Sequence, residues 1–209
     1  MEAPQRIALE ESDLALTDSG YFVLLWRLLK RERLPRISGL SYLRALLTLP
    51  EFCAAGATFW VMPSHQSAET NRSWLSGQNC PVSREDCYVA PYYDRGDLED
   101  SALLGLLEVR RPRFVVICLG GGVQERLGYF LRNRLGYRPA IICTGAAIAF
   151  LSGDQSTIPG WVDRLFMGWF LRIIGNPRRF LPRYIRSAKL VAQVLKADKL
   201  ASQPFAVDR

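Results

Sequence analysis

The chain has 209 residues, of which 49% are hydrophobic, so it can bury a core of ordinary size and is not a disordered chain. The charge-free stretch at residues 139–153 is shorter than the roughly 17 to 25 apolar residues of a spanning helix, and the acidic N-terminus is the wrong flank for a signal peptide. We therefore expect no segment to cross a bilayer, whereas the net charge of +7 indicates an anionic partner.

In chain order, the pattern first predicts helices at 21–30 and 40–49, separated by a loop with Pro35 and Gly39. From Ala57 onward, β-rich runs alternate with helical patterns, which is typical of parallel βαβ units. The predicted strands are 57–62, 87–93, 114–119 and 140–145, with helices near 66–74, 97–109 and 123–135 between them. Glu99 and Asp100 are expected in the first turn of the second of these helices. The sequence thus predicts an α/β fold with a Rossmann-like, mostly parallel sheet, N-terminal helices and a basic, aromatic-rich helical C-terminal appendage.

We expect three regions: an α/β domain at 1–160, a basic amphipathic appendage at 161–200 and a frayed end at 201–209. The division rests on the distribution of charged residues along the chain. Residues 1–160 hold 17 basic and 17 acidic side chains, whereas residues 161–209 hold 10 and 3. Between Trp161 and Arg186 the basic residues alternate with large apolar ones. This alternation suits a membrane-surface segment or a phosphate clamp, and it disfavours a nucleic-acid binder.

The five cysteines form an odd set without a C-x-x-C pair, and Cys118 and Cys143 lie in runs typical of buried strands. We interpret them as reduced core thiols of a cytosolic protein. The single histidine, His65, has no neighbouring ligand spacing, so a loop or capping role is expected and a metal site is not.

Three glycines, Gly120, Gly121 and Gly122, follow the most apolar predicted strand and precede a helix. Glycines there let backbone amides approach a phosphate, and we expect the amides of this turn to be free for an anion or a ribose. Gln124 and Glu125 would face the carboxyl ends of the strands, where open α/β sheets bind ligands. Because the spacing lacks G-x-G-x-x-G, a plain tight turn stays open as an alternative, as does a dipole-complementing role for Glu125.

Asp18 stands where an apolar run breaks at a polar turn. A carboxylate at such a boundary can act as a general base. More often such a residue caps the following helix, and the residues alone favour capping.

Four segments form an ordered series. The first is SDLALTDSGYFVLLWRLLKRERLPRISG, with Asp13, Asp18, Arg36 and Gly39; the second is LGGGVQER, with Gly120, Gln124 and Glu125. The third is TGAAIAFLSGDQSTIPGW, with Gly145, Gly153 and Pro159; the fourth is GWFLRIIGNPRRFLPRY, with Trp169, Arg172, Pro177 and Arg179. Tyr92 and Tyr93 precede the second. The series resembles the motifs of the WecG/TagA/CpsF family of bacterial glycosyltransferases. The first segment is similar to A-D-x-x-x-P-D-G followed by R-V-x-G, the second to G-x-P-x-Q-E, and the two tyrosines to G-Y-F. The third segment is similar to G-G-x-F-D-x-x-A-G-x-x-x-R-A-P and the fourth to L-E-W-L-x-R-L-x-x-E-P-x-R.

The resemblance implies transfer of an N-acetylmannosamine-type or glucose-type sugar from a UDP donor to a polyprenyl-diphosphate-linked acceptor, in cell-surface polysaccharide synthesis at the inner face of the membrane. It implies that Asp18 is the general base. From the residues themselves we expect the nucleotide part of the donor to bind at the turn of residues 120–125. It also implies that the tail, through Arg172, Arg179 and Arg183, closes over the site, neutralises diphosphate and touches the anionic membrane. Arginines in that role would make a metal cofactor unnecessary.

The chain also departs from the family pattern. Ala149, Thr157 and Gly168 stand at the aspartate of F-D, the arginine of R-A-P and the glutamate of L-E-W. The family's T-P-N element, which precedes the Asp18 block, has no counterpart, so we expect either a longer natural start or the loss of that part of the site. These changes favour a second interpretation, a catalytically silent relative that serves as a membrane-associated binding or scaffold subunit. The residues kept together argue against it and for the enzyme: Asp18, Gln124, Glu125, Arg172 and Arg179.

Overall fold

The computed structural model describes residues 3–94 and 98–155. These residues fall into two compact units, one made of residues 3–16 and 39–155 and the other of residues 17–38. Each unit is considered by itself. The predicted boundary at residue 160, the appendage at 161–200 and the end at 201–209 lie outside the described residues.

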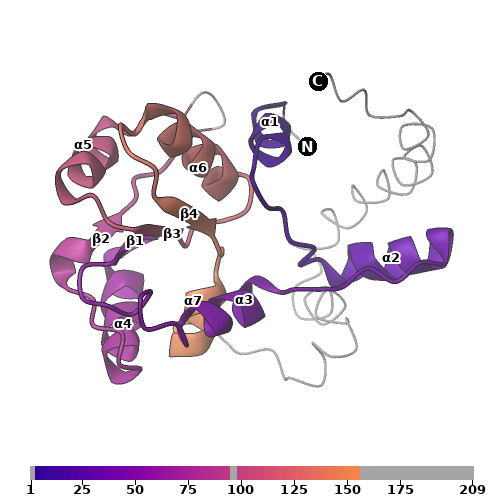
Figure 1. Ribbon diagram of the computed structural model, residues 1–209, viewed down its shortest axis with the longest axis horizontal. Helices are drawn as coiled ribbons and strands as arrows, with labels where there is room; N and C mark the ends of the chain where they lie inside the picture. Colours follow the sequence, from indigo (N-terminus) through magenta and orange to yellow (C-terminus); the bar gives the residue numbers. More distant parts are fainter. Residues whose placement is uncertain (1–2, 95–97, 156–209) are drawn as a thin grey trace. The chain divides into compact units, whose positions relative to one another are not determined.

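A four-stranded parallel sheet forms the centre of the first unit (Figure 1). Its strands are β1 (Thr58–Met62), β2 (Cys87–Val89), β3 (Phe114–Ile117) and β4 (Ala140–Cys143), in the order β2-β1-β3-β4. The expected α/β fold with a parallel sheet is thereby confirmed. Because β2 and β3 lie on opposite sides of β1, the order of the strands reverses between β1 and β3. Open α/β sheets bind their ligands at the carboxyl ends of the strands beside such a point.

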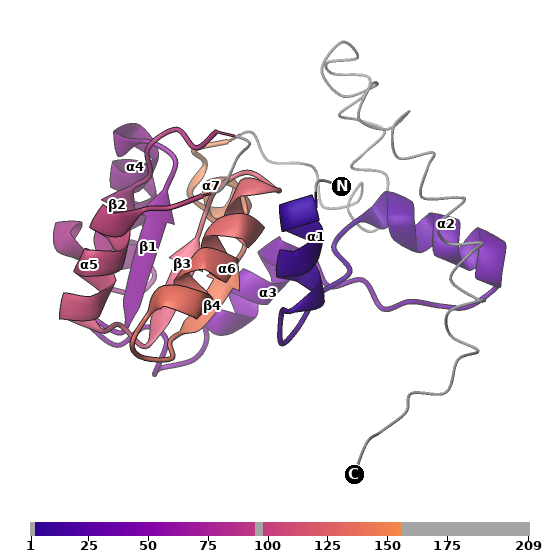
Figure 2. The ribbon, with the colours of Figure 1, turned by 90° about the horizontal axis from the view of Figure 1, so that it is seen from above.

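Alternation along the strands divides the core into two layers. Trp60 and Met62 of β1 pack with α3 (Gly39–Leu46), α4 (His65–Gly77) and α7 (Ala147–Ser152). Phe59 and Val61 pack on the opposite face with α5 (Ser101–Arg110) and α6 (Val123–Arg134). Figure 1 shows the two helical layers on either side of the sheet, and Figure 2 shows the same unit from above, from the side of α5 and α6. Strands buried on both faces explain the continuous apolar runs in the sequence.

An unexpected helix, α1 (Ala3–Glu10), packs on α6. The residues that follow α1 also contact α6, since Nη2 of Arg132 on α6 lies 3.3 Å from Oδ1 of Asp13. The sequence pattern also did not predict α7 or the 3-10 helix Arg84–Asp86, all of them too short for a clear period.

The second unit contains α2 (Gly20–Lys30), close to the predicted 21–30. Its N-cap is Ser19, whose hydroxyl accepts a hydrogen bond from the amide of Phe22 at 3.2 Å. The chain then returns beside its start: the amide of Ile37 donates to the Thr17 carbonyl at 3.2 Å, and the Thr17 hydroxyl donates to the Pro35 carbonyl at 2.5 Å.

Four local expectations need correction. The strand predicted at 87–93 ends at Val89. Asp100 is the N-cap of α5 and lies before its first turn, where its carboxylate accepts from the amide of Leu103. Cys143 is solvent-exposed because it ends the edge strand β4, whereas Cys118 is buried as expected. His65 is the first residue of α4, and the cap is its neighbour Ser64.

None of the helices within the described residues is both long enough and apolar enough to span a membrane.

Candidate functional site at the carboxyl edge of the sheet

The three glycines lie in the turn that connects β3 to α6. The structural reason for a glycine differs from one position to the next. Gly122 has a φ of +93°, a backbone conformation that favours glycine. Gly120 and Gly121 are exposed, and a Cβ at either would meet no atom within 4 Å. Turn geometry therefore explains Gly122, whereas packing does not require glycine at 120 and 121. Small residues at those two positions leave the backbone open to an approaching ligand.

The amides of this turn are less available than the sequence suggested. The Gly122 amide donates to the Glu125 carboxylate, and the amides of Val123 and Gln124 both donate to the Gly120 carbonyl at 3.2 Å. Glu125 thus caps the helix from its third position, as in one half of a capping box. The expectation of free amides is wrong for residues 122–124. Gly120 and Gly121 donate to no acceptor among the described residues.

Gln124 joins this turn to the loop that follows β4. Its side-chain Oε1 accepts a hydrogen bond from the amide of Gly145 at 2.7 Å, and its Nε2 donates to Glu125 Oε1 at 3.1 Å. Gly145 has a φ of +59°, so a glycine suits that position. Gln124 and Gly145 belong to two different motifs of the sequence, and this single hydrogen bond brings them together.

Gly39 brings a third motif to the same edge. A Cβ on Gly39 would lie 3.1 Å from the carbonyl oxygen of Thr144, a contact too close for most side chains. Thr144 directly precedes Gly145, so the start of α3 packs against the loop that Gln124 holds. The loops after β3 and β4 and the start of α3 therefore form one connected structure.

Asp18 lies in the second unit, and the structure corrects its capping interpretation. Ser19, one residue later, is the N-cap of α2, and its hydroxyl accepts a hydrogen bond from the amide of Phe22. The Asp18 side chain is 64% exposed. Arg36 is its neighbour: Nε of Arg36 donates to the Asp18 carbonyl at 2.8 Å, and its Nη2 lies 3.8 Å from Oδ1. Arg172, Arg179 and Arg183 lie outside the described residues.

Sequence reasoning missed a buried carboxylate beside β2. Asp100, which caps α5, also accepts hydrogen bonds from the hydroxyls of Tyr88 and Tyr93, at 2.9 and 2.6 Å. Burial, followed by the hydrogen bond to Asp100, raises the pKa of Tyr88 to about 12, and the same causes raise the pKa of Tyr93. The available signal was an Asp near a predicted helix start, and it indicated only a favourable interaction with the helix dipole.

Arg126 is the second missed residue. It follows the Q-E pair directly and is only 8% exposed, although it carries a charge. Its Nε donates to the Gly122 carbonyl at 3.1 Å, and its Nη2 donates to the Asp94 carbonyl at 3.1 Å. Arg126 thus links the glycine turn to the segment that follows β2.

Within the described residues no group of three or more His, Cys, Asp or Glu side chains is arranged to hold a metal ion. Ala149, at the position of the family's aspartate, is 5% exposed and belongs to α7. Thr157 and Gly168 lie outside the described residues.

Comparison with known proteins identifies the family of this chain. The sequence pattern of the glycosyl transferase WecG/TagA/CpsF family matches residues 3–203. The chain is 26% identical over 196 residues to an N-acetylglucosaminyldiphosphoundecaprenol N-acetyl-β-D-mannosaminyltransferase of Bacillus subtilis strain 168, covering 91% of this chain and 72% of the relative. It is 24% identical over 200 residues to the protein of the same name from Bacillus spizizenii strain W23, covering 94% of this chain and 73% of that relative. The predicted resemblance is confirmed, and the chain belongs to the WecG/TagA/CpsF family of glycosyl transferases.

Proposed function

We propose that the chain transfers an N-acetylmannosamine-type sugar from a UDP donor to an N-acetylglucosaminyl-diphosphate-polyprenol acceptor in the synthesis of a cell-surface polysaccharide. The family match and the names of both relatives support the acceptor and the sugar class. The observation that carries the proposal is the hydrogen bond between Gln124 and Gly145, because it joins two family motifs at the carboxyl edge of the sheet.

In the proposed reaction, an acceptor hydroxyl attacks the anomeric carbon of the donor sugar while the bond from that carbon to the UDP oxygen breaks. Asp18 takes the proton of the hydroxyl, and UDP leaves as an anion. The UDP moiety lies at Gly120 and Gly121 beside the first turn of α6. Arg172, Arg179 and Arg183 stabilise the diphosphate, so that no metal ion is required.

We further propose that the protein works in the cytoplasm, bound peripherally to the inner face of the membrane. A lipid-linked acceptor must be met at that surface. The basic and apolar residues of the tail would bind this surface, since cations attract anionic lipid and apolar side chains enter the membrane interface.

The direct test is to incubate the full chain with UDP-N-acetylmannosamine and a short-chain lipid-diphosphate N-acetylglucosamine, and to follow UDP release and the lipid-linked disaccharide. UDP-glucose serves as the comparison donor, and a chelator such as EDTA tests metal independence. Product that forms with UDP-N-acetylmannosamine and persists with EDTA supports the proposal. UDP binding without product from any donor contradicts it.

One observation favours the second candidate, a catalytically silent binding or scaffold subunit. Ala149 of α7 replaces the family's aspartate at a position that is only 5% exposed, so a small apolar side chain stands where the family has a carboxylate. In this case the protein would bind UDP or the lipid-linked acceptor without turnover. Restoring the family residue as Ala149→Asp distinguishes the two candidates: activity that appears only in this variant identifies a silent relative.

A further inference from the structure

The segment that follows β2, residues 90–94, extends along the carboxyl edge of the sheet from β1 to the glycine turn. It begins at the end of β1, where the Ala90 amide donates to the Met62 carbonyl at 2.9 Å. It ends at Asp94, whose carbonyl accepts from the Arg126 guanidinium at 3.1 Å. The same guanidinium donates to the Gly122 carbonyl at 3.1 Å, so this one side chain bridges the segment and the glycine turn.

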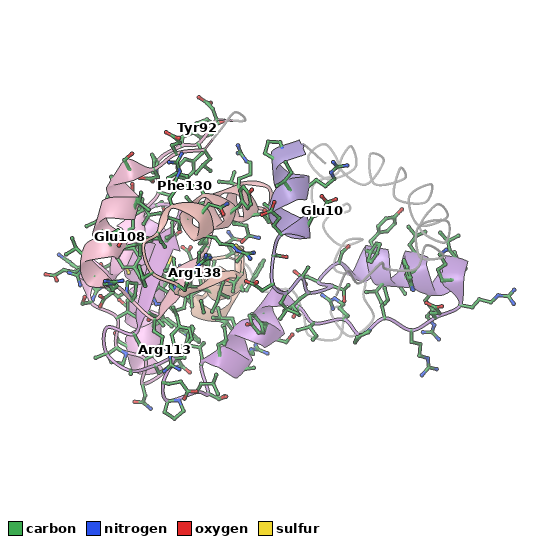
Figure 3. The ribbon with its side chains drawn as sticks, turned by 45° about the horizontal axis from the view of Figure 1, so that its top comes forward. Glu10, Tyr92, Glu108, Arg113, Phe130 and Arg138 are labelled. Carbon is green, nitrogen blue, oxygen red and sulfur yellow. The ribbon has the colours of Figure 1, made fainter. Side chains whose placement is uncertain are left out.

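The side chains of this segment point in different directions. Ala90 and Tyr93 pack against the core cluster between the sheet and the α5–α6 layer, and the Tyr93 hydroxyl donates to buried Asp100 at 2.6 Å. Tyr92 is 90% exposed, although Ala90 before it and Tyr93 after it pack against the core. It lies at the margin of the sheet unit (Figure 3). The segment therefore presents a large aromatic ring to solvent from a backbone that is fixed at Ala90, Tyr93 and Asp94.

Such a ring is suited to a flat apolar ligand. Stacking of a nucleobase on an aromatic side chain is typically worth about 1 to 3 kcal/mol per base, and a fixed backbone lowers the entropy lost on binding. Two residues of chain span at most about 7 Å, so Tyr92 lies near Asp94, which the Arg126 guanidinium joins to Gly122. A nucleoside diphosphate whose phosphates meet Gly120 and Gly121 can place its base within reach of this ring.

We propose that Tyr92 is the stacking platform for the base of the donor nucleotide, with Arg126 as the residue that positions its segment beside the glycine turn. The inference rests on the proposed function, since it assumes a nucleoside diphosphate at the carboxyl edge. It adds a recognition element for the base, separate from the groups that meet the phosphates.

Calorimetric titration of the full chain with UDP tests the proposal, with Tyr92→Ala and Tyr92→Phe as the decisive variants. Tyr92→Ala removes the ring, and we expect the dissociation constant for UDP to rise about 5- to 150-fold. Tyr92→Phe keeps the ring and should bind UDP within about twofold of the wild type. The matched control is Val109→Ala, which shortens another apolar residue of the same unit that is 85% exposed; its UDP affinity should equal that of the wild type.

Inorganic diphosphate, used as a competitor, separates the base from the phosphates. Tyr92→Ala should bind inorganic diphosphate as the wild type does, because the ring contacts only the base. If Tyr92→Ala binds UDP as tightly as the wild type, or loses UDP and diphosphate in parallel, the proposal is overturned. A wild type that binds no UDP at all refutes the proposed function and this inference with it, whereas an unaffected Tyr92→Ala variant refutes the inference alone.

Discussion

Arg36 holds the backbone of Asp18 while the carboxylate of Asp18 remains exposed. The two residues are 18 positions apart in the chain; the Arg36 Nε donates to the Asp18 carbonyl at 2.8 Å, and its Nη2 lies 3.8 Å from the carboxylate. The Arg36 side chain is only 16% exposed, against 64% for Asp18. A general base must reach a hydroxyl of the substrate, and an exposed carboxylate on a fixed backbone meets that need.

Asp18→Asn should lower the turnover of a lipid-diphosphate acceptor by at least about 100-fold, because the amide cannot take the proton of the hydroxyl. The melting temperature should change little, since Ser19 caps α2 and asparagine keeps the size of the side chain. Turnover and thermal unfolding are measured on the same preparation.

Ser19→Ala is the matched control for Asp18. It removes the cap and should lower stability by about 1 kcal/mol, while the turnover of the folded protein stays near that of the wild type. A stable Asp18→Asn variant with wild-type turnover would exclude Asp18 as the base.

Gln124→Ala should weaken UDP binding about tenfold and lower the melting temperature by a few degrees. The variant leaves the part-buried Gly145 amide without its acceptor, and an unsatisfied amide costs at most about 1 to 3 kcal/mol when fully buried. Loss of this bond frees the loop after β4 from the glycine turn. Calorimetric titration with UDP and thermal unfolding together report both effects.

Gln66→Ala is the control, because the Gln66 side chain makes an exposed hydrogen bond with Thr70 on α4. Both its UDP affinity and its melting temperature should match the wild type. Equal UDP affinity in Gln124→Ala and Gln66→Ala would show that the glycine turn does not take part in donor binding.

Apolar runs were enough to predict the parallel sheet and the places of β1 and β3, because these strands are buried on both faces and read as continuous apolar segments. The edge strand β2 is only half-buried, and its end was predicted too late. The glycine turn was placed correctly for the same reason. The contacts within the site were not predictable, since the bond from Gln124 to Gly145 spans 21 residues and depends on the pairing of β3 with β4. Asp18 and Ser19 are adjacent potential caps, and only backbone geometry decides between them.

Stability should fall as the pH rises from about 10 to about 12. In the unfolded chain a tyrosine ionises near pH 10, whereas the folded protein raises the pKa of Tyr88 to about 12 and also raises that of Tyr93. The unfolded state therefore loses protons first, and the free energy of unfolding decreases through this window.

Tyr93→Phe tests the origin of this fall. The variant loses the hydrogen bond to Asp100, so between pH 7 and about pH 9 it should be less stable than the wild type by a constant amount. Above about pH 10 the difference should shrink, because only the wild type has this hydroxyl to ionise. Urea unfolding across the pH range measures it, and a difference that stays constant up to high pH would assign the fall to other groups.

The basic tail should bind anionic vesicles reversibly and lose this binding as salt rises. Each Arg or Lys near an anionic surface contributes about 1 kcal/mol, and salt screens the attraction beyond about a Debye length. In the full chain, replacing Arg178, Arg179 and Arg183 by Gln should therefore weaken co-sedimentation with phosphatidylserine-rich vesicles about 100-fold. Replacing three exposed arginines of the sheet unit, Arg84, Arg113 and Arg138, changes the net charge equally and is expected to have a much smaller effect. If the two triple variants lose binding to the same extent, total charge and not the tail determines membrane association. A truncation after Gly160 that still binds as the full chain does would lead to the same conclusion.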